Sequence, residues 1–135
     1  MEDFVPFEIA IKIKEKGFNE PCYKYYQRGV LDSDDCWNRY NRGTADRCSA
    51  PTISQVLKWL REEKKIHIEP CVLADADTNT DGKIINEYIY WSFSITSIET
   101  ADMIYFEYEH IDDKRFDSYE QAAIAGMQYV LDNIL

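Results

Sequence analysis

The chain has 135 residues, of which 45% are hydrophobic and 30% are charged, with only 5 Gly and 4 Pro. This composition is typical of one globular domain over 1–135 and excludes a disordered or low-complexity protein. The formal net charge of −10 repels phosphate, so general binding of nucleic acid is disfavoured. The N-terminus lacks the pattern of a signal peptide, and no apolar run is long enough to cross a bilayer. We therefore expect a cytoplasmic protein that does not contact a membrane.

The first predicted element is a helix between Pro6 and Gly17. Proline suits the first turn of a helix, and glycine suits the position just past its end. Phe7, Ala10 and Ile11 fall on one side of this helix. The same residues also alternate with a period of two, so periodicity alone leaves a strand open. The positions of the proline and the glycine favour the helix.

The next segment, CYKYYQRGVL at 22–31, is rich in aromatic residues that favour strands. Gly29 interrupts it, which predicts a short strand or a hairpin. Residues 32–50 are polar and show no period, so we expect an irregular, exposed excursion there. Loops of this length are often functional.

Two later helices are predicted from their capping residues. Thr52 can cap the first of them together with Gln55, and this helix ends near Lys64. Its apolar residues have helical spacing: Ile53, Val56, Leu57 and Leu60. The second helix begins at Ser118, with Gln121 in the same capping role. Small residues in its middle would let it lie close to another element.

Three strands are predicted between these helices. The first, KIHIEPCVL, contains Pro70, which lacks one ladder donor and indicates an edge or a bulge. The clearest is INEYIYWSFSI, in which Trp91 and Phe93 point to one face. The third, DMIYFEYEH, ends at His110. The fold class is therefore α+β: a three-stranded antiparallel meander plus a short N-terminal β element, with about three helices packed on one sheet face.

Residues 77–88, DTNTDGKIINEY, have the pattern of an EF-hand calcium loop at five positions: Asp77, Asn79, Asp81, Gly82 and Ile84. Position 12, however, is Tyr88 instead of a bidentate acid, and the flanks are predicted strands instead of helices. The Asp81-Gly82 pair is itself a hairpin signal. We therefore predict an acidic hairpin tip at 75–83 and no metal site. Weak cation binding is the alternative, by Asp75, Asp77, Asn79 and Asp81.

Aromatic and arginine side chains alternate along the segment that includes the excursion. These residue types dominate protein interfaces and also platforms for single-stranded nucleic acid. The candidate contact residues are Tyr23, Tyr25, Tyr26, Arg28, Trp37, Arg39, Tyr40 and Arg42. In the alternative interpretation, the tyrosines cover the edge of the core and the arginines pair with neighbouring aspartates. If the surface is functional, we expect a protein or peptide partner, because the acidic total disfavours nucleic acid.

Residues that could carry catalysis are sparse. The four cysteines lie far apart without a C-x-x-C pair, so we expect free thiols. His67 should face away from Ile66 and Ile68, and neither it nor His110 lies near a nucleophile in the sequence. No nucleotide-binding, hydrolase or metalloprotease motif is present. We expect no catalytic residue and no cofactor.

Three segments, FVPFEIAIKIKEKGFNEPC, APTISQVLKWLREE and FDSYEQAA, resemble small uncharacterised proteins of gut Bacteroidales and of their phages and mobile elements. The resemblance covers most of the chain except 32–46 and 75–83, and it lies in fold-forming residues. It implies a compact accessory protein that acts by binding. We therefore expect a non-enzymatic binding module with a protein or peptide partner. The alternatives are an acidic nucleic-acid mimic that blocks a basic nucleic-acid-binding protein, and an unrecognised hydrolase.

Overall fold

The computed structural model describes residues 3–32, 47–105 and 115–135. Within them the chain forms three helices, α1 (Phe7–Glu15), α2 (Ile53–Glu63) and α3 (Tyr119–Asn133). One antiparallel sheet has the order β2-β1-β3, with β1 (Tyr25–Gln27), β2 (Val30–Asp32) and β3 (Arg47–Ser49). The other has the order β4-β5-β6, with β4 (Ile66–Thr78), β5 (Ile84–Ser97) and β6 (Met103–Tyr105). The α+β class is confirmed.

The two capped helices begin at the predicted residues. The Thr52 hydroxyl accepts a hydrogen bond from the Gln55 amide at 3.2 Å, and Ser118 accepts one from the Gln121 amide at 3.2 Å. Each hydroxyl satisfies one of the amides that have no partner inside the helix. The Gln55 side chain does not return to the cap but donates to the carbonyl of Pro21 at 3.1 Å. The cap thereby also fixes the chain that leads into β1.

The N-terminal helix is also confirmed, because α1 starts directly after Pro6 and its last turn ends before Gly17. Gly17 has a φ of +96°, a backbone conformation that favours glycine. The amide of Phe18 then donates to the carbonyl of Ile13 at 2.9 Å, which closes the end of the helix.

The predicted three-stranded antiparallel meander is present as β4-β5-β6, and the short N-terminal β element belongs to a second three-stranded sheet that was not predicted. Its third strand, β3, lies inside the range 32–50 that was predicted to be irregular, and it pairs with β1 through Tyr26 and Cys48. This partner lies more than 20 residues away, so the local pattern did not reveal the pairing. Residues 33–46 of the excursion lie outside the described residues, as does the predicted third strand beyond Tyr105, with His110.

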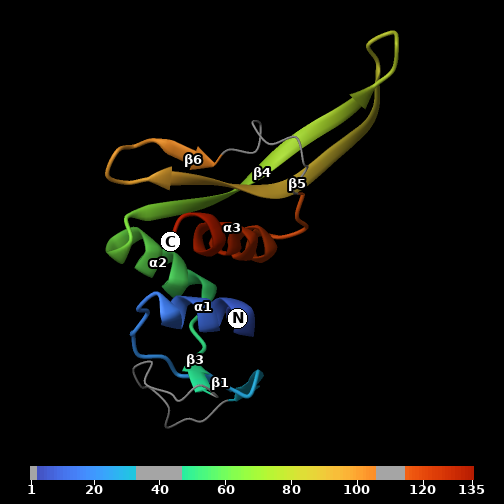
Figure 1. Cartoon of the computed structure of the whole chain (residues 1–135). Helices are drawn as coiled ribbons and strands as arrows, with labels where there is room; N and C mark the ends of the chain where they lie inside the picture. The colour runs from blue at the N-terminus through green and yellow to red at the C-terminus, as the bar shows by residue number, and fades with distance from the viewer. Residues whose placement is uncertain (1–2, 33–46, 106–114) are drawn as a thin grey trace.

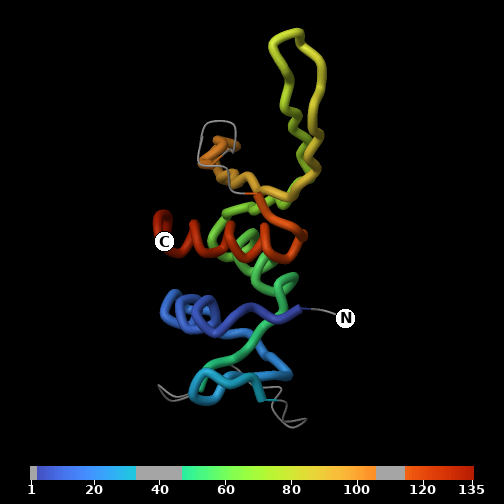
Figure 2. The backbone as a smooth tube through the Cα atoms, turned by 90° about the vertical axis from the view of Figure 1, so that its right-hand side faces the viewer, coloured from blue at the N-terminus to red at the C-terminus, as the bar shows by residue number. Residues whose placement is uncertain are grey.

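The helices do not all lie on one sheet face, which corrects the second part of the predicted architecture. α3 packs on β4 and β5, α2 contacts both β4 and α3, and α1 contacts α3 and β3. Figures 1 and 2 show α3 between the large sheet and α1, with α2 beside α3. Its buried residues surround more than one side of the helix: Ala122, Ala123, Gly126, Met127, Val130 and Leu131. A helix with several apolar sides must be covered from several directions.

The core under the large sheet is centred on Phe93, which is 1% exposed and stacks on Tyr105 at 4.8 Å. The prediction that small residues bring the last helix close to another element is confirmed. A Cβ atom at Gly126 would lie 2.7 Å from the Cγ2 atom of Ile68. Trp91 shares the face of Phe93 but is only half-buried, with its ring edge-on to Tyr119 at 5.7 Å. It therefore lies at the margin of the core.

Candidate functional site

The far part of the β4–β5 hairpin, residues 72–90, projects beyond the body of the protein, and we call it the arm (Figures 1 and 2). Strand β4 continues into the predicted acidic tip at 75–83 as far as Thr78, and residues 79–83 form the turn before β5 resumes at Ile84. The hairpin itself is confirmed. Its turn is held by the Asn79 side chain, whose Oδ1 accepts hydrogen bonds from the amides of Asp81 and Lys83 at 2.9 and 3.0 Å.

The prediction that Pro70 marks an edge strand is confirmed, because β4 lies at one edge of the large sheet. Trp91 exchanges two backbone hydrogen bonds with Phe116, at 2.8 and 2.9 Å, so its backbone groups point away from β4. Those of Phe93, two residues further on, point the same way. Pro70 pairs with Phe93, so its own backbone groups point to the outer edge of the sheet. The donor that proline lacks is therefore not needed inside the ladder.

One face of the arm carries small and aliphatic side chains that continue the face covered by α3. Alternation along the strands places Ala74, opposite Ile89, on this face next to Val72. Ile84 and Ile85 follow the turn, where the register shifts. Four large aliphatic residues, which we call the arm aliphatics, are between 53% and 80% exposed: Val72, Ile84, Ile85 and Ile89.

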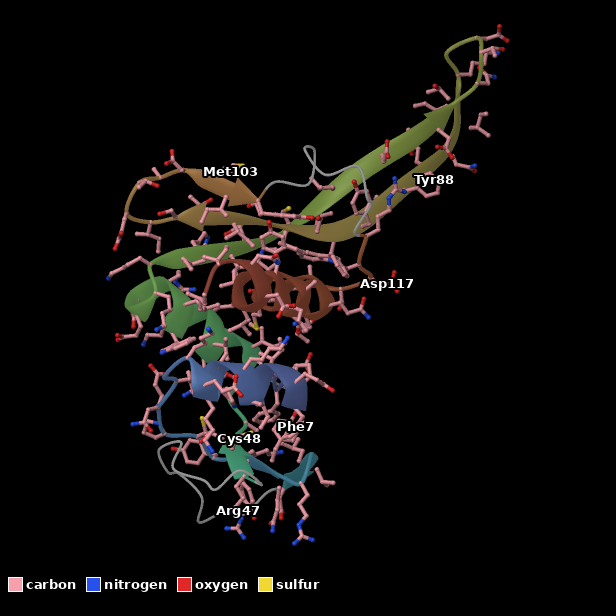
Figure 3. The ribbon with its side chains drawn as sticks, viewed as in Figure 1. Phe7, Arg47, Cys48, Tyr88, Met103 and Asp117 are labelled. Atoms are coloured by element: carbon pink, nitrogen blue, oxygen red, sulfur yellow. The ribbon has the colours of Figure 1, made fainter. Side chains whose placement is uncertain are left out.

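The opposite face of the arm is polar, and its groups bind one another. The Arg115 guanidinium forms an ion pair with Asp75 at 2.8 Å and lies over the rings of Tyr88 and Tyr90, 5.4 and 4.8 Å from their centroids. The Tyr88 hydroxyl, labelled in Figure 3, donates to Asp77 at 2.6 Å. This hydrogen bond raises the pKa of the Tyr88 phenol. Arg115 thus ties the polar face to the segment that precedes α3.

The four oxygen-bearing residues of the candidate cation loop mostly have other contacts. Asp75 binds Arg115, Asp77 accepts from Tyr88, and the Asn79 side chain closes the turn. In the described part of the chain, no three His, Cys, Asp or Glu side chains lie together as a group that could hold a metal ion. Weak calcium binding at this loop stays a prediction.

The predicted contact residues divide into three groups. Tyr25 and Tyr26 are buried, which corrects their expected role as surface anchors. The Tyr26 hydroxyl donates to the Val5 carbonyl at 2.6 Å, a partner inside the core. Tyr23 and Arg28 are exposed. The remaining predicted residues lie outside the described ranges: Trp37, Arg39, Tyr40 and Arg42. A contact surface at this segment stays a prediction.

The described histidine and cysteines are not arranged as a nucleophile and its base. His67 lies opposite to the buried Ile66 and Ile68, as predicted, and its Nε2 is 2.7 Å from Glu69. Cys71 is four residues along the same face, about 13 Å away at the usual rise of a strand. Burial raises the pKa of the Cys22 thiol to about 11, the opposite of what a nucleophilic thiolate needs. Cys22, Cys48 and Cys71 are free thiols.

An open depression of about 530 Å³ lies beside α3, but its polar groups are engaged with one another. Gln128 donates to Asp132 at 2.7 Å, and Lys12 binds the other oxygen of Asp132 at 2.8 Å. These two contacts lower the pKa of the Asp132 carboxyl. Arg115, at the rim, pairs with Asp75. The depression therefore offers no converging set of free polar groups for a small ligand.

Charge is distributed unequally between the two ends of the molecule. Residues 1–65 contain twelve basic and eleven acidic side chains, whereas residues 66–135 contain three basic and fourteen acidic ones. The large sheet, including the arm, and α3 belong to the acidic part, and the small sheet lies at the opposite end (Figure 1). We call the small sheet with its β1–β2 turn and the preceding Lys24 the basic end, because these described residues include Lys24, Arg28 and Arg47 and one acid, Asp32. The sequence between β2 and β3, at 33–46, adds two basic and three acidic residues.

Comparison with protein-family models, with curated proteins and with solved structures gave no match. The resemblance to proteins of gut Bacteroidales and their phages therefore stays a prediction. No helix in the described residues is long and apolar enough to cross a membrane. The arguments for function therefore come from the geometry of the chain itself.

Proposed function

We propose that this protein acts by binding another protein and that the arm is its contact element. The observation that carries the proposal is the exposure of the arm aliphatics on a hairpin that projects from the body. Grouped apolar residues at a surface mark interaction sites, since leaving them in water costs free energy that a partner recovers. A two-stranded hairpin without further packing is marginally stable at best. Contact with a partner would stabilise it.

The arm has two properties that suit a contact element. Its base is held by the Arg115–Asp75 ion pair and by the register of β4 with β5, so the arm needs little ordering when it binds. Beyond Val72, no described strand pairs with either long edge of the arm, so backbone groups along these edges can pair with another strand. Addition of a partner strand would combine backbone hydrogen bonds with burial of the aliphatic face.

An acidic nucleic-acid mimic is the second candidate. The charge of residues 66–135, with fourteen acidic and three basic side chains, supports it. A mimic would hold its partner mainly by charge, so moderate salt would release the complex. Binding through the arm aliphatics would depend less on salt, because burial of apolar surface is not screened. Salt dependence therefore separates the two candidates.

The experiment uses the tagged protein as bait in extracts of its native host, with two matched pairs of substitutions. The arm pair is Val72→Thr with Ile89→Thr, which keeps β-branched side chains in the strands but removes apolar surface. The control pair is Ile98→Thr with Met103→Thr, at exposed positions of the same sheet region. We expect the arm pair to lose a partner that the control pair and the wild type retain at moderate salt.

Two results would contradict this proposal. The first is equal capture of every partner by the arm pair and the wild type, which would show that the arm is not the contact element. The second is loss of capture only in Trp37→Ala with Tyr40→Ala, which would place the contact surface at the predicted segment between Tyr23 and Arg47. Release of a basic nucleic-acid-binding protein by moderate salt, without dependence on the arm pair, would favour the mimic.

A further inference from the structure

We propose that the occupant of the arm is the basic end of a second copy of this chain, so that copies assemble head to tail. The inference rests on the proposed role of the arm as the contact element.

The basic end presents apolar and cationic side chains together at one extremity of the molecule. Arg28 and Gly29 form the β1–β2 turn with φ values of +52° and +78°, the mirror-image turn that favours a tight hairpin. Val30 and Leu31 follow on the edge strand β2 and are 67% and 41% exposed. Arg47, on the other side of β1, lies at the end of the molecule opposite to the arm (Figure 3).

Charge favours the basic end over a second exposed apolar site, Ile98 with Met103 near the start of β6. Residues 98–103 contain two acidic residues and no basic one, whereas residues 24–49 contain five basic and four acidic ones. The arm carries four acidic side chains and one basic one, so an acidic site would repel it. Like charges brought together across an interface cost free energy, whereas opposite charges fix the partner and the register.

The arginines of the basic end are suited to meet the acids of the arm. Neither Arg28 nor Arg47 forms an ion pair with a described carboxylate. On the arm, Glu87 shares the face of Ile89, while Asp81 lies in the turn. Arginine can bind a carboxylate with two parallel hydrogen bonds, and it is enriched at interfaces. Within the described residues no further strand pairs with the outer edge of β2 or with the arm strands, so these strands can extend one another's sheets.

The net charge of −10 does not prevent this contact. The Debye length at physiological ionic strength is about 8 Å, so charges beyond the contact region are screened. The arm and the basic end lie at opposite extremities of an elongated molecule (Figure 2). When the arm of one copy meets the basic end of another, the acidic body of each copy is therefore distant from the other. Local complementarity then decides the interaction.

The geometry determines the kind of assembly. The arm and the basic end are different surfaces, so their contact is heterologous and leaves one free arm and one free basic end on every complex. Further copies add at both ends unless the rotation closes a ring. An isologous dimer through two arms would instead bring two sets of acidic side chains together.

Sedimentation of the full-length chain over a range of concentrations tests the proposal. We expect the average mass of the wild type to rise beyond that of a dimer and to fall only in part at high salt, because the charge pairs are screened but the apolar contact is not. The arm variant, Ile85→Lys with Ile89→Lys, and the end variant, Arg28→Glu with Arg47→Glu, change exposed positions, so folding should be kept. Each change should weaken assembly by more than about tenfold, since charged or truncated anchors at interfaces typically cost that much.

A mixture of the two variants gives the decisive result. Each variant retains the surface that the other has lost, so we expect a one-to-one complex in the mixture and nothing larger. Self-association of the end variant alone would show an arm-to-arm contact, and a wild type that is monomeric at every concentration would exclude self-assembly; both overturn the inference. Capture of a foreign partner that depends on the arm, by a monomeric wild type, would leave the proposed function intact.

Discussion

Replacing Gly126 with alanine should destabilise the protein, although the same change stabilises most helices. In an exposed helix, alanine is favoured over glycine by about 1 kcal/mol. At this position the new methyl group would lie 2.7 Å from the Cγ2 atom of Ile68 and 3.3 Å from the ring of Phe93. Both neighbours are buried, at 3% and 1% exposure, so they have little room to move.

The magnitude follows from the balance of these two effects. An extra methyl group in a packed core costs typically 1–3 kcal/mol, because side chains or the backbone must shift. After subtraction of the helix preference, we expect a net loss of up to about 2 kcal/mol in the free energy of unfolding. For a domain of this size, that corresponds to a fall of up to about 8 °C in Tm.

Urea unfolding of four proteins would measure the clash directly: the wild type, Gly126→Ala, Ile68→Leu and the double variant. Leucine moves the branch of Ile68 away from Cβ and so removes the methyl group that alanine would strike. We expect the alanine to cost less in the leucine background, with a coupling free energy of at least about 0.5 kcal/mol. A Gly126→Ala variant that is more stable than the wild type, or additive changes in the cycle, would refute the close approach of α3 to the sheet.

Four further outcomes are expected. Phe93→Ala should lower the free energy of unfolding by about 3–5 kcal/mol, and Trp91→Ala by clearly less, since only the first ring is fully buried; equal losses would contradict this. Burial raises the pKa of the Cys22 thiol from 9.0 to about 11, so its stabilising contribution is full below pH 9 and is lost as the pH rises towards 11. The fall in the free energy of unfolding between pH 9 and 11 should therefore be smaller in Cys22→Ala than in the wild type. An equal fall in both proteins would count against the burial of this thiol. Calorimetric titration with calcium should give no micromolar site; a tight site abolished by Asp77→Ala would show the opposite. Arg115→Ala should speed hydrogen exchange in the arm but change the global stability by less than about 1 kcal/mol, because the ion pair is partly exposed; unchanged exchange would disprove its role in holding the arm.

The helices could be predicted from the sequence because their signals are local. Thr52 and Ser118 lie within three residues of the amides that they cap, and Pro6 and Gly17 are adjacent to the helix that they delimit. The burial of α3 on several sides could not be read in the same way. Its stripe of small residues predicted a close contact, but only the fold shows that Gly126 meets the sheet while other sides of α3 meet α1 and α2.

The length of the arm was missed because its strands contain residues that disfavour strands. Asp75 and Asp77 indicate a loop by composition. They do alternate with Ala74 and Ala76, a period of two that could have revealed the strand. What stabilises the aspartates is not local: Arg115, which binds Asp75, is 40 residues away. The exposed aliphatic face was therefore absent from the predicted site.

The error at Tyr25 and Tyr26 has a different origin. Tyrosine is common both at interfaces and in cores, because it combines a large apolar ring with one polar atom. The sequence cannot show whether that atom finds a partner inside the protein. In this fold the Tyr26 hydroxyl finds the Val5 carbonyl and the Tyr25 hydroxyl finds Asp32. Both rings can therefore be buried at no cost in lost hydrogen bonds.

The central place of α3 has a consequence for how the protein is made. Helix α3, which packs on both the large sheet and α1, follows all the other described elements in the sequence. Its contacts therefore join distant parts of the chain: Lys12 on α1 binds Asp132 on α3, 120 residues away. Until α3 has been synthesised, the surfaces of α1 and of the β4–β5 sheet that pack on α3 have no cover. Native packing must then wait until synthesis has passed Val130, and contacts of such long separation form slowly. Nascent chains therefore carry exposed apolar surface until α3 has left the ribosome, which makes them substrates for chaperones and prone to aggregation when these are scarce.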